Sequence, residues 1–352
     1  MGGKSRKRHG RSGERPLRGV MRLGRIADLQ LLLPLAGIVL FLLFPAQAAE
    51  GALSGLRLAA EVLIPSLFPV GVLSGCLLRM GPEAAAERLA GRAVRGLFCL
   101  PGAGALPLVL GLLGGFPLGA RLVASLYREG RLSRAEALGL SALCNNAGPA
   151  FLLGVAGSAL GDPRLGAALM VVQALSVLLV GLLLRAPGLV PKTAPRRSAD
   201  TPGFGDALLR SIGDTAGAML TLTGTVVFFC AALACLEAAL PLDRLPPLVR
   251  AAVSGALEVS GGVAALRGLA PESAFPLAAL LTGWGGCCVH LQAAEALRAA
   301  GLPVGPYLRG KLLQGAICLL LAALATVAAE TFASPTSVFG VMRFLIQNGF
   351  AV

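Results

Sequence analysis

The stretch LSALCNNAGPAFLLGV, Leu140–Val155, places two asparagines, a glycine and a proline in the middle of an apolar run of membrane length. An unpaired backbone group in hydrocarbon is costly, so a helix break persists at membrane depth only where protein, water or a bound solute satisfies the freed groups. Gly148 and Pro149 can end one half-helix and begin the next, while Asn145 and Asn146 supply both donors and acceptors. The stretch therefore predicts a broken membrane helix beside a cavity.

The composition around this stretch is that of a membrane protein. Of the 352 residues, 55% are hydrophobic and 14% are charged, and the mean hydropathy is +0.77. Ordinary soluble domains carry about 25% charged residues. Apolar segments of membrane length recur from residue 30 to residue 333. We therefore predict a single all-α polytopic membrane domain.

The N-terminal region predicts the orientation of the chain. Residues 1–27 carry nine basic side chains against Glu14 alone, and residues 1–28 contain no Phe, Trp or Tyr, so they lack the stacking platforms of single-strand nucleic-acid sites. We expect no nucleic-acid partner and interpret this block as a cytoplasmic tail under the positive-inside rule. The next segment, 29–50, is predicted to be the first transmembrane helix. It ends in Ala46-Gln47-Ala48, which resembles a signal-peptidase site, so a cleaved signal peptide is the alternative.

Eight further apolar segments form two halves, 51–185 and 206–333, around a basic linker at 186–205 and before a tail at 334–352. They lie at 53–80, 103–128, 135–160 and 165–184, and then at 214–240, 247–268, 274–300 and 307–333. Breaks are predicted at GGFP (Gly114–Pro117), CNNAGP (Cys144–Pro149), EVSGG (Glu258–Gly262) and GWGGCCVH (Gly283–His290), with interruptions also at Pro65 and Pro69.

The charges also predict how the two halves are related. With the N-terminal tail and the linker both cytoplasmic, the first half must cross the membrane an odd number of times, so one of its four segments is expected to be re-entrant. The second half then begins inside and ends outside. We therefore predict two inverted repeats with broken or re-entrant helices plus one extra N-terminal span. In secondary transporters this architecture places the substrate at the repeat interface.

The predicted solute site consists of the four breaks and the polar residues beside them. It comprises Gly114, Gly115, Phe116, Pro117, Arg121, Asn145, Asn146, Gly148, Pro149, Glu258, Ser260, Gly261, Gly283, Trp284, Gly285, Gly286, His290 and Gln292. Half-helix N-termini suit an anion and freed carbonyls suit a cation. The alternative for the asparagine pair is a purely interhelical role. Glu258 either faces a cavity, carries a proton or caps a short helix, and Arg121 either binds an anion or snorkels toward the interface.

Catalytic and metal motifs are weak. GPYLRGKL, Gly305–Leu312, matches the phosphate-loop spacing until Leu312 replaces the required Ser or Thr. The eight cysteines show no C-x-x-C pair and are interpreted as small buried hydrophobes, and two histidines leave little material for a hydrolase. We therefore expect no enzyme activity, no cofactor and no metal site.

Five motifs, in this order, resemble the YlbJ (SpoVV) family of sporulation integral membrane proteins. They are PSLFPVGVLSG (Pro65–Gly75), GGFPLGARLVASLYREGRLSRAEA (Gly114–Ala137), LCNNAGPAFLLGVAG (Leu143–Gly157), LEVSGGV (Leu257–Val263) and GWGGCCVHLQ (Gly283–Gln292). That family belongs to the nucleoside-recognition or Gate-domain group, which is similar to concentrative nucleoside transporters. The resemblance implies transport of dipicolinate, a small aromatic dianion, from the mother cell toward the forespore, in the cell membrane or the outer forespore membrane.

The resemblance also suggests roles for particular residues. Arg121 and half-helix N-termini would bind the carboxylates, the asparagine pair would add hydrogen bonds, and Phe116 and Trp284 would face the ring. The implied partners are the small anionic solute, membrane lipid, and either a second copy of the chain or other sporulation membrane proteins. A nucleoside or other small-solute carrier is one alternative, and a membrane scaffold that carries no solute is another.

Overall fold

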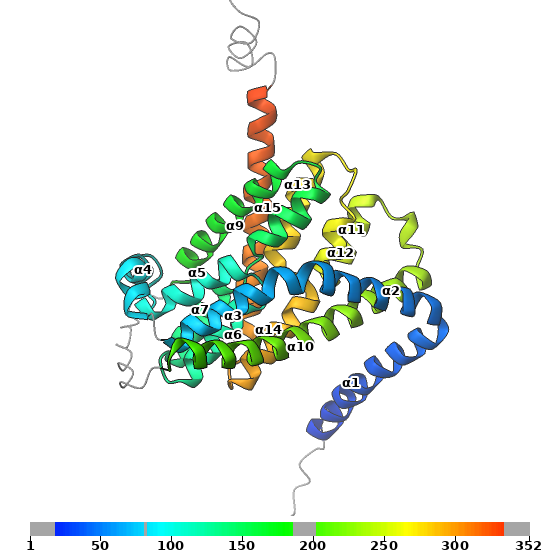
Figure 1. The fold of residues 1–352 in the computed structure, drawn as a ribbon. Helices are drawn as coiled ribbons and strands as arrows, with labels where there is room; N and C mark the ends of the chain where they lie inside the picture. The colour runs from blue at the N-terminus through cyan, green and yellow to red at the C-terminus, as the bar shows by residue number, and fades with distance from the viewer. Residues whose placement is uncertain (1–17, 81–82, 186–201, 334–352) are drawn as a thin grey trace, which may run out of the picture.

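The computed structural model describes residues 18–80, 83–185 and 202–333 (Figure 1). Every regular element within these ranges is helical. Among the described residues, five helices are long and apolar enough to cross a membrane, or six if one bent pair counts as a span. The protein is thus an all-α polytopic membrane protein, as predicted. Most of the predicted N-terminal tail and linker, and the whole C-terminal tail, lie outside the described residues.

The N-terminal helices differ from the predicted boundaries. α1 (Arg18–Leu43) begins inside the block interpreted as a tail through residue 28. The chain then breaks at Phe44, and α2 (Pro45–Leu58) starts with a proline, where a missing N–H costs a helix nothing. The prediction that the first span runs to residue 50 is therefore wrong, because residues 45–50 belong to the next helix.

That next helix is continuous through both prolines expected to interrupt it. α2 passes through a π-helical turn, η1 (Ala59–Leu63), into α3 (Ile64–Met80), and together they form one candidate span of 36 residues. The π-turn ends two residues before Pro65, and its wider winding accommodates the proline ring and its missing N–H. The expected interruptions at Pro65 and Pro69 are therefore wrong.

The rest of the first half follows the predicted order and adds one helix. Its elements are α4 (Glu83–Phe98), η2 (Gly102–Gly104), α5 (Ala105–Gly114), α6 (Leu118–Arg128), α7 (Arg134–Cys144), η3 (Ala150–Ala156), α8 (Gly157–Ala159) and α9 (Pro163–Leu184). The predicted breaks at GGFP and CNNAGP are confirmed, since α5 and α7 end there. The sequence analysis missed α4, which meets the next helical segment at a bend of 104°.

The second half repeats this order. Its elements are α10 (Phe204–Ala239), η4 (Leu242–Arg244), α11 (Pro247–Leu257), α12 (Val259–Ala264), α13 (Pro271–Trp284), α14 (Gly286–Ala299) and α15 (Gly305–Ala333). The break in EVSGG falls at Glu258 and that in GWGG at Gly285. Each half therefore contains a long helix, a broken pair, a second broken pair and a closing long helix.

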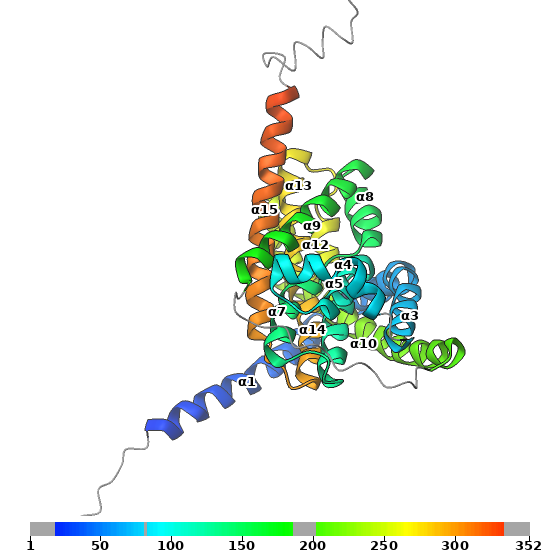
Figure 2. The same cartoon turned by 90° about the vertical axis from the view of Figure 1, so that its left-hand side faces the viewer.

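The two halves run in opposite directions. A Cβ added to Gly55 of α2 would lie 2.9 Å from Val227 Cα, whereas one on Gly71 of α3 would lie 2.8 Å from Thr215 Cγ2, so α10 is antiparallel to α2 and α3. α9 and α15 are also antiparallel, because Gln173 meets Cys318 while Ser176 meets Gln314. In Figure 1, α10 and α3 run across the view and overlap the upright α15, and Figure 2 shows that they lie to one side of it. This arrangement matches the predicted inverted repeats.

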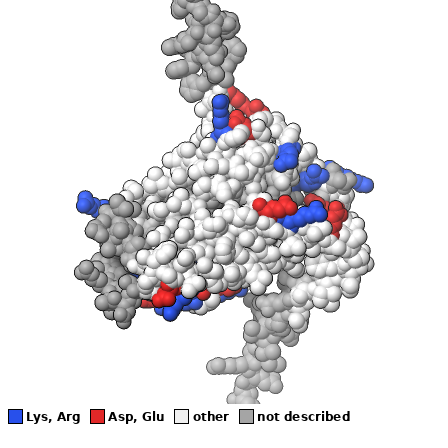
Figure 3. Space-filling view, in the orientation of Figure 1, with Lys and Arg blue, Asp and Glu red and all other residues white. Residues whose placement is uncertain are grey.

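The outer surface fits a lipid environment. Figure 3 shows a broad uncharged face with Lys, Arg, Asp and Glu gathered toward its edges. On α10, Leu209 and Leu220 are 70% and 76% exposed. Water would disfavour such exposure, whereas hydrocarbon tolerates it.

Candidate functional site

The two breaks of each half touch through their glycines. In the first half, a Cβ added to Gly148 would lie 3.0 Å from Gly115 N. In the second half, a Cβ added to Gly286 would lie 3.0 Å from Gly255 O, where the chain leaves α11. Gly115 and Gly286 also have φ of +77° and +78°, a conformation that favours glycine. Glycine at these positions therefore allows the broken backbones to pack directly together.

The breaks of opposite halves also meet. Phe116 lies beside the second half's break, because a Cβ on Gly285 would be 3.3 Å from its Cζ. Between the breaks and the α2–α3 and α10 walls lies a cavity of about 250 Å³. Eight predicted site residues line it: Gly114, Gly115, Phe116, Gly148, Pro149, Glu258, Ser260 and Gln292. We call this space the central cavity. All four breaks contribute to it or to its walls.

Glu258 both lines the central cavity and caps a helix. Its Oε1 accepts a hydrogen bond from Ser260 N at 3.0 Å and its Oε2 accepts one from Gly261 N at 2.7 Å, while the residue is only 2% exposed. A carboxylate at a helix N-terminus is favourable because it pairs with free N–H groups and the helix dipole. The N-terminus of α12 is therefore already capped by the Glu258 carboxyl group. The start of η3, after Pro149, has no side-chain cap and also faces the cavity.

The two asparagines lie behind the cavity wall. Both are fully buried and neither lines the central cavity. Asn145 Nδ2 donates to Tyr307 Oη at 3.0 Å, and Asn146 Oδ1 accepts from Gln314 Nε2 at 2.8 Å. Asn146 Nδ2 also donates to Leu143 O at 2.7 Å. These bonds join the end of α7 to α15, which is the interhelical arrangement considered as the alternative to solute binding.

A buried lysine completes this polar cluster. Lys311 of α15 is 0% exposed, and its Nζ donates to Asn145 O at 2.8 Å and to Gln314 Oε1 at 2.7 Å. The sequence analysis considered Lys311 only as part of GPYLRGKL, which is helical from Gly305 and so does not form a phosphate loop. The signal that would have found Lys311 is a charge within an apolar helix of membrane length.

His290 and Trp284 belong to the same cluster. His290 Nδ1 lies 2.9 Å from Tyr307 Oη, and its ring packs edge-on against Trp284 with 4.1 Å between centroids. The neighbouring Gly283 packs against α15, because a Cβ there would lie 2.8 Å from Cys318 Sγ. These three predicted site residues therefore lie beside α15 and do not line the central cavity.

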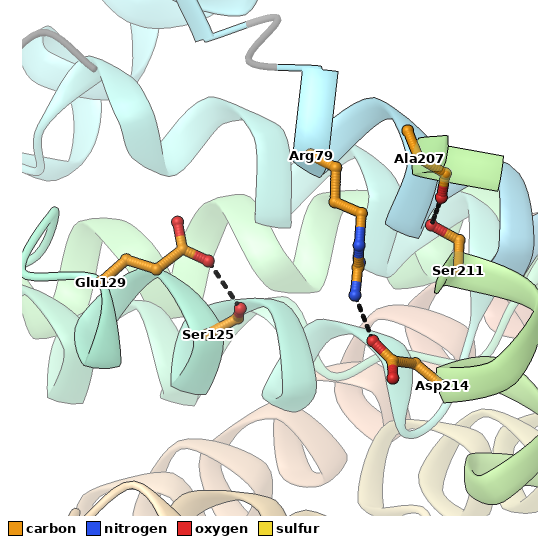
Figure 4. A network of polar contacts seen from close by, with 6 residues as sticks. All are labelled: Arg79, Ser125, Glu129, Ala207, Ser211 and Asp214. Atoms are coloured by element: carbon orange, nitrogen blue, oxygen red, sulfur yellow. Dashed lines mark hydrogen bonds and ion pairs between the residues drawn. The ribbon is translucent and has the colours of Figure 1, made fainter. Parts of the chain in front are cut away.

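Arg121 lies in a separate groove of about 690 Å³ together with Pro117. Its Nη2 is 3.8 Å from Glu295 Oε2. The groove adjoins the central cavity, since Phe116 lines both. Arg79 and Asp214 form an ion pair at its rim, close to the Ser125–Glu129 hydrogen bond (Figure 4).

A third cavity of about 430 Å³ lies on the opposite side of the central cavity. We call this third cavity the outer cavity. Glu258 lines both the central and the outer cavity, whereas Gly261 lines only the outer cavity. Glu50 and Glu237 also line the outer cavity, which therefore contains three carboxylate side chains. The two outer spaces differ in charge, because the groove on the Phe116 side contains three arginines and only two acidic residues: Arg79, Arg121, Arg128, Asp214 and Glu295.

Comparison with known proteins identifies one related membrane protein. The chain is 34% identical over 159 residues to the sporulation integral membrane protein YlbJ of Bacillus subtilis (strain 168). The match covers 45% of this chain and 39% of the relative, so the chain spans about two fifths of the length of the curated relative it matches. No family model matches the chain, and no solved structure matches it. The likeness supports the YlbJ part of the resemblance, and the wider Gate-domain group stays a prediction.

Proposed function

We propose that this chain is a membrane carrier of sporulation that moves dipicolinate from the mother cell toward the forespore. The observation that carries the proposal is the meeting of four helix breaks from two opposed halves around the central cavity. Broken helices are tolerated at membrane depth where they line a cavity, and opposed repeats hold substrate at their interface. The sporulation role rests on the similarity to YlbJ.

The shape and lining of the central cavity suit a small aromatic anion. Its volume is about 250 Å³, whereas pockets for drug-sized ligands measure about 300–1,000 Å³. A molecule with a single ring is therefore of a suitable size. Phe116 and Leu222 offer apolar faces to a ring, while Ser260 and Gln292 offer polar groups. The start of η3 has no side-chain cap, and the positive end of its helix dipole faces the cavity, which favours a carboxylate. Lys311 adds positive charge behind the wall, 5.3 Å from the centre of the Phe116 ring.

A matched pair of substitutions on α10 tests the cavity. Leu222 is 3% exposed and lines the central cavity, whereas Leu220 is 76% exposed on the outer surface of the same helix. We expect Leu222→Trp to fill the cavity and to lower dipicolinate uptake into proteoliposomes by at least about tenfold, equivalent to about 1.4 kcal/mol of binding free energy. Leu220→Trp should leave uptake within about twofold of the wild type, since its ring would enter lipid.

The same assay separates the alternatives. Wild-type protein that moves uridine and not dipicolinate would replace the proposal with a nucleoside carrier. Protein that is folded in liposomes and moves neither solute would favour a scaffold. Equal uptake by the two tryptophan variants would show that solute does not pass through the central cavity.

A further inference from the structure

Lys311 occupies an unusual position for a buried charge. Lysine is almost never fully buried unless it is paired with an acid. Among the described residues, no carboxylate forms an ion pair with Lys311. Its partners are instead neutral oxygens, Asn145 O and Gln314 Oε1, and its remaining side faces the Phe116 ring. The ammonium is therefore held by carbonyl groups and an aromatic face.

The helix break explains why Asn145 O needs a partner from outside its own helix. In a continuous helix, Asn145 O would accept a hydrogen bond from the N–H four residues later, but that residue is Pro149, which has none. Asn145 Oδ1 is likewise buried, and no described group donates to it. Asn145 thus has two buried oxygens at the end of α7, of which the backbone O and Gln314 Oε1 share Lys311 Nζ as a donor. Freed carbonyls at broken membrane helices are the groups that coordinate coupling cations in transporters.

We propose that Lys311 is a tethered cation that takes the place of a bound alkali-metal ion at the first half's break. Neutral carbonyl and amide oxygens are the ligands that Na⁺ and K⁺ accept. Nζ lies 2.8 Å and 2.7 Å from two of them, and so already satisfies the charge requirement of the break. Its consequence for transport, which rests on the proposed function, is that uptake requires neither Na⁺ nor K⁺.

Two substitutions at Lys311 test the binding part without any transport assay. Lys311→Ala removes the ammonium and leaves space among the oxygens, whereas Lys311→Met fills the space with an uncharged chain. We measure the melting temperature of the purified full chain in choline chloride, NaCl and KCl at equal ionic strength. The wild type and Lys311→Met should each have the same melting temperature in all three salts. Lys311→Ala should melt lower in choline and gain about 3–5 °C in NaCl or KCl, because a ligand that binds only the native state stabilises it.

Two results would overturn the proposal. One is a higher melting temperature of the wild type in NaCl or KCl than in choline chloride, which would mean that the break still binds a metal ion. The other is a folded Lys311→Ala variant that gains nothing in either salt. If Lys311→Ala does not fold, wild-type uptake decides: equal uptake with and without Na⁺ and K⁺ supports the tethered cation, and a loss of about tenfold in choline refutes it. A wild type that moves no solute in any buffer refutes the proposed function alone, and the melting comparison still stands.

Discussion

The break at Asn145–Pro149 in the first half and the break at Gly285 in the second half occupy the same position in their repeats but are built differently. The first is satisfied by side chains, since Asn146 bonds to Gln314 and Lys311 reaches Asn145 O. At Gly285, the hydrogen bond that closes the helix in the described residues joins backbone groups. Gly285 adopts φ of +97° and its N–H closes α13 on Leu281 O at 2.7 Å. The two repeats therefore have the same order of helices and breaks, but different groups satisfy the backbone at the two breaks.

The surroundings of Asn145–Pro149 and of Gly285 differ in the same way. The polar side chains of the first break extend to Gln173 and Ser176 of α9, so a network joins α7, α9 and α15. The glycine break of the second half packs instead against Phe116, which lines the central cavity. The central cavity thus lies between one break that is supported from behind by side-chain hydrogen bonds and one break that is made of close backbone contacts.

The largest expected effect comes from the glycines that seat the first break. A Cβ on Gly119 would overlap the carbonyl oxygen of Cys144 at the end of α7. We expect Gly119→Ala to lower the free energy of unfolding by more than about 3 kcal/mol, because a backbone atom cannot move aside as a side chain does. Gly224→Ala on α10, where an added Cβ meets nothing within 4 Å, is the control and should be neutral or stabilising. Thermal melting in detergent measures both, and equal melting temperatures would contradict the packing described for α6 and α7.

A smaller loss is expected from the polar network of the first break. Asn146→Ala would remove the acceptor shared by the Gln314 and Gln173 amides and the donor to Leu143 O. We expect a cost of about 1–3 kcal/mol for the buried groups left unpaired. A double-mutant cycle with Gln314→Ala should show that the two costs are not additive. Additive costs would mean that the 2.8 Å contact contributes nothing to stability.

The second break should respond to backbone conformation and not to polarity. Gly285→Ala places a Cβ on a left-handed residue and is expected to cost about 1–2 kcal/mol. Gly285→Asn should cost less than Gly285→Ala, although its side chain is larger, because asparagine tolerates this conformation. Chemical denaturation of the three proteins gives the order, and a greater loss for the asparagine variant would show that contact with Phe116 dominates instead.

The smallest effect is expected at the groove rim, away from both breaks. Asp214→Asn removes the ion pair between Arg79 and Asp214. The Asp214 side chain is 71% exposed. Exposed pairs contribute less than about 1 kcal/mol and weaken with salt. The difference in melting temperature from the wild type should therefore disappear in high salt. A loss as large as that of Asn146→Ala would show that this rim is structural.

Sequence patterns were sufficient to predict where the chain breaks and how the breaks are ordered. Apolar runs of membrane length, interrupted by Gly-Pro, Gly-Gly and a lone glutamate, predicted the helical class, the two halves and the four breaks. These signals are local, because each interruption leaves backbone or charged groups whose exposure to hydrocarbon costs free energy. The same local view misplaced the end of the first span. It also expected Pro65 to interrupt a helix that in fact passes it by a π-turn, since a single-helix rule does not include such a compensation.

The tertiary structure alone decided which polar residues share a space. Asn145 and Lys311 are separated by 166 residues in the chain and meet only because α15 packs against the end of α7. Arg121 was predicted at the solute site, yet the turn of α6 directs it into the neighbouring groove beside Glu295. Hydropathy indicates how costly it is to place a residue at membrane depth. Which group that residue contacts depends on how helices far apart in the sequence pack together. Local sequence therefore determined the breaks, and the packing of the two halves determined what each break contacts.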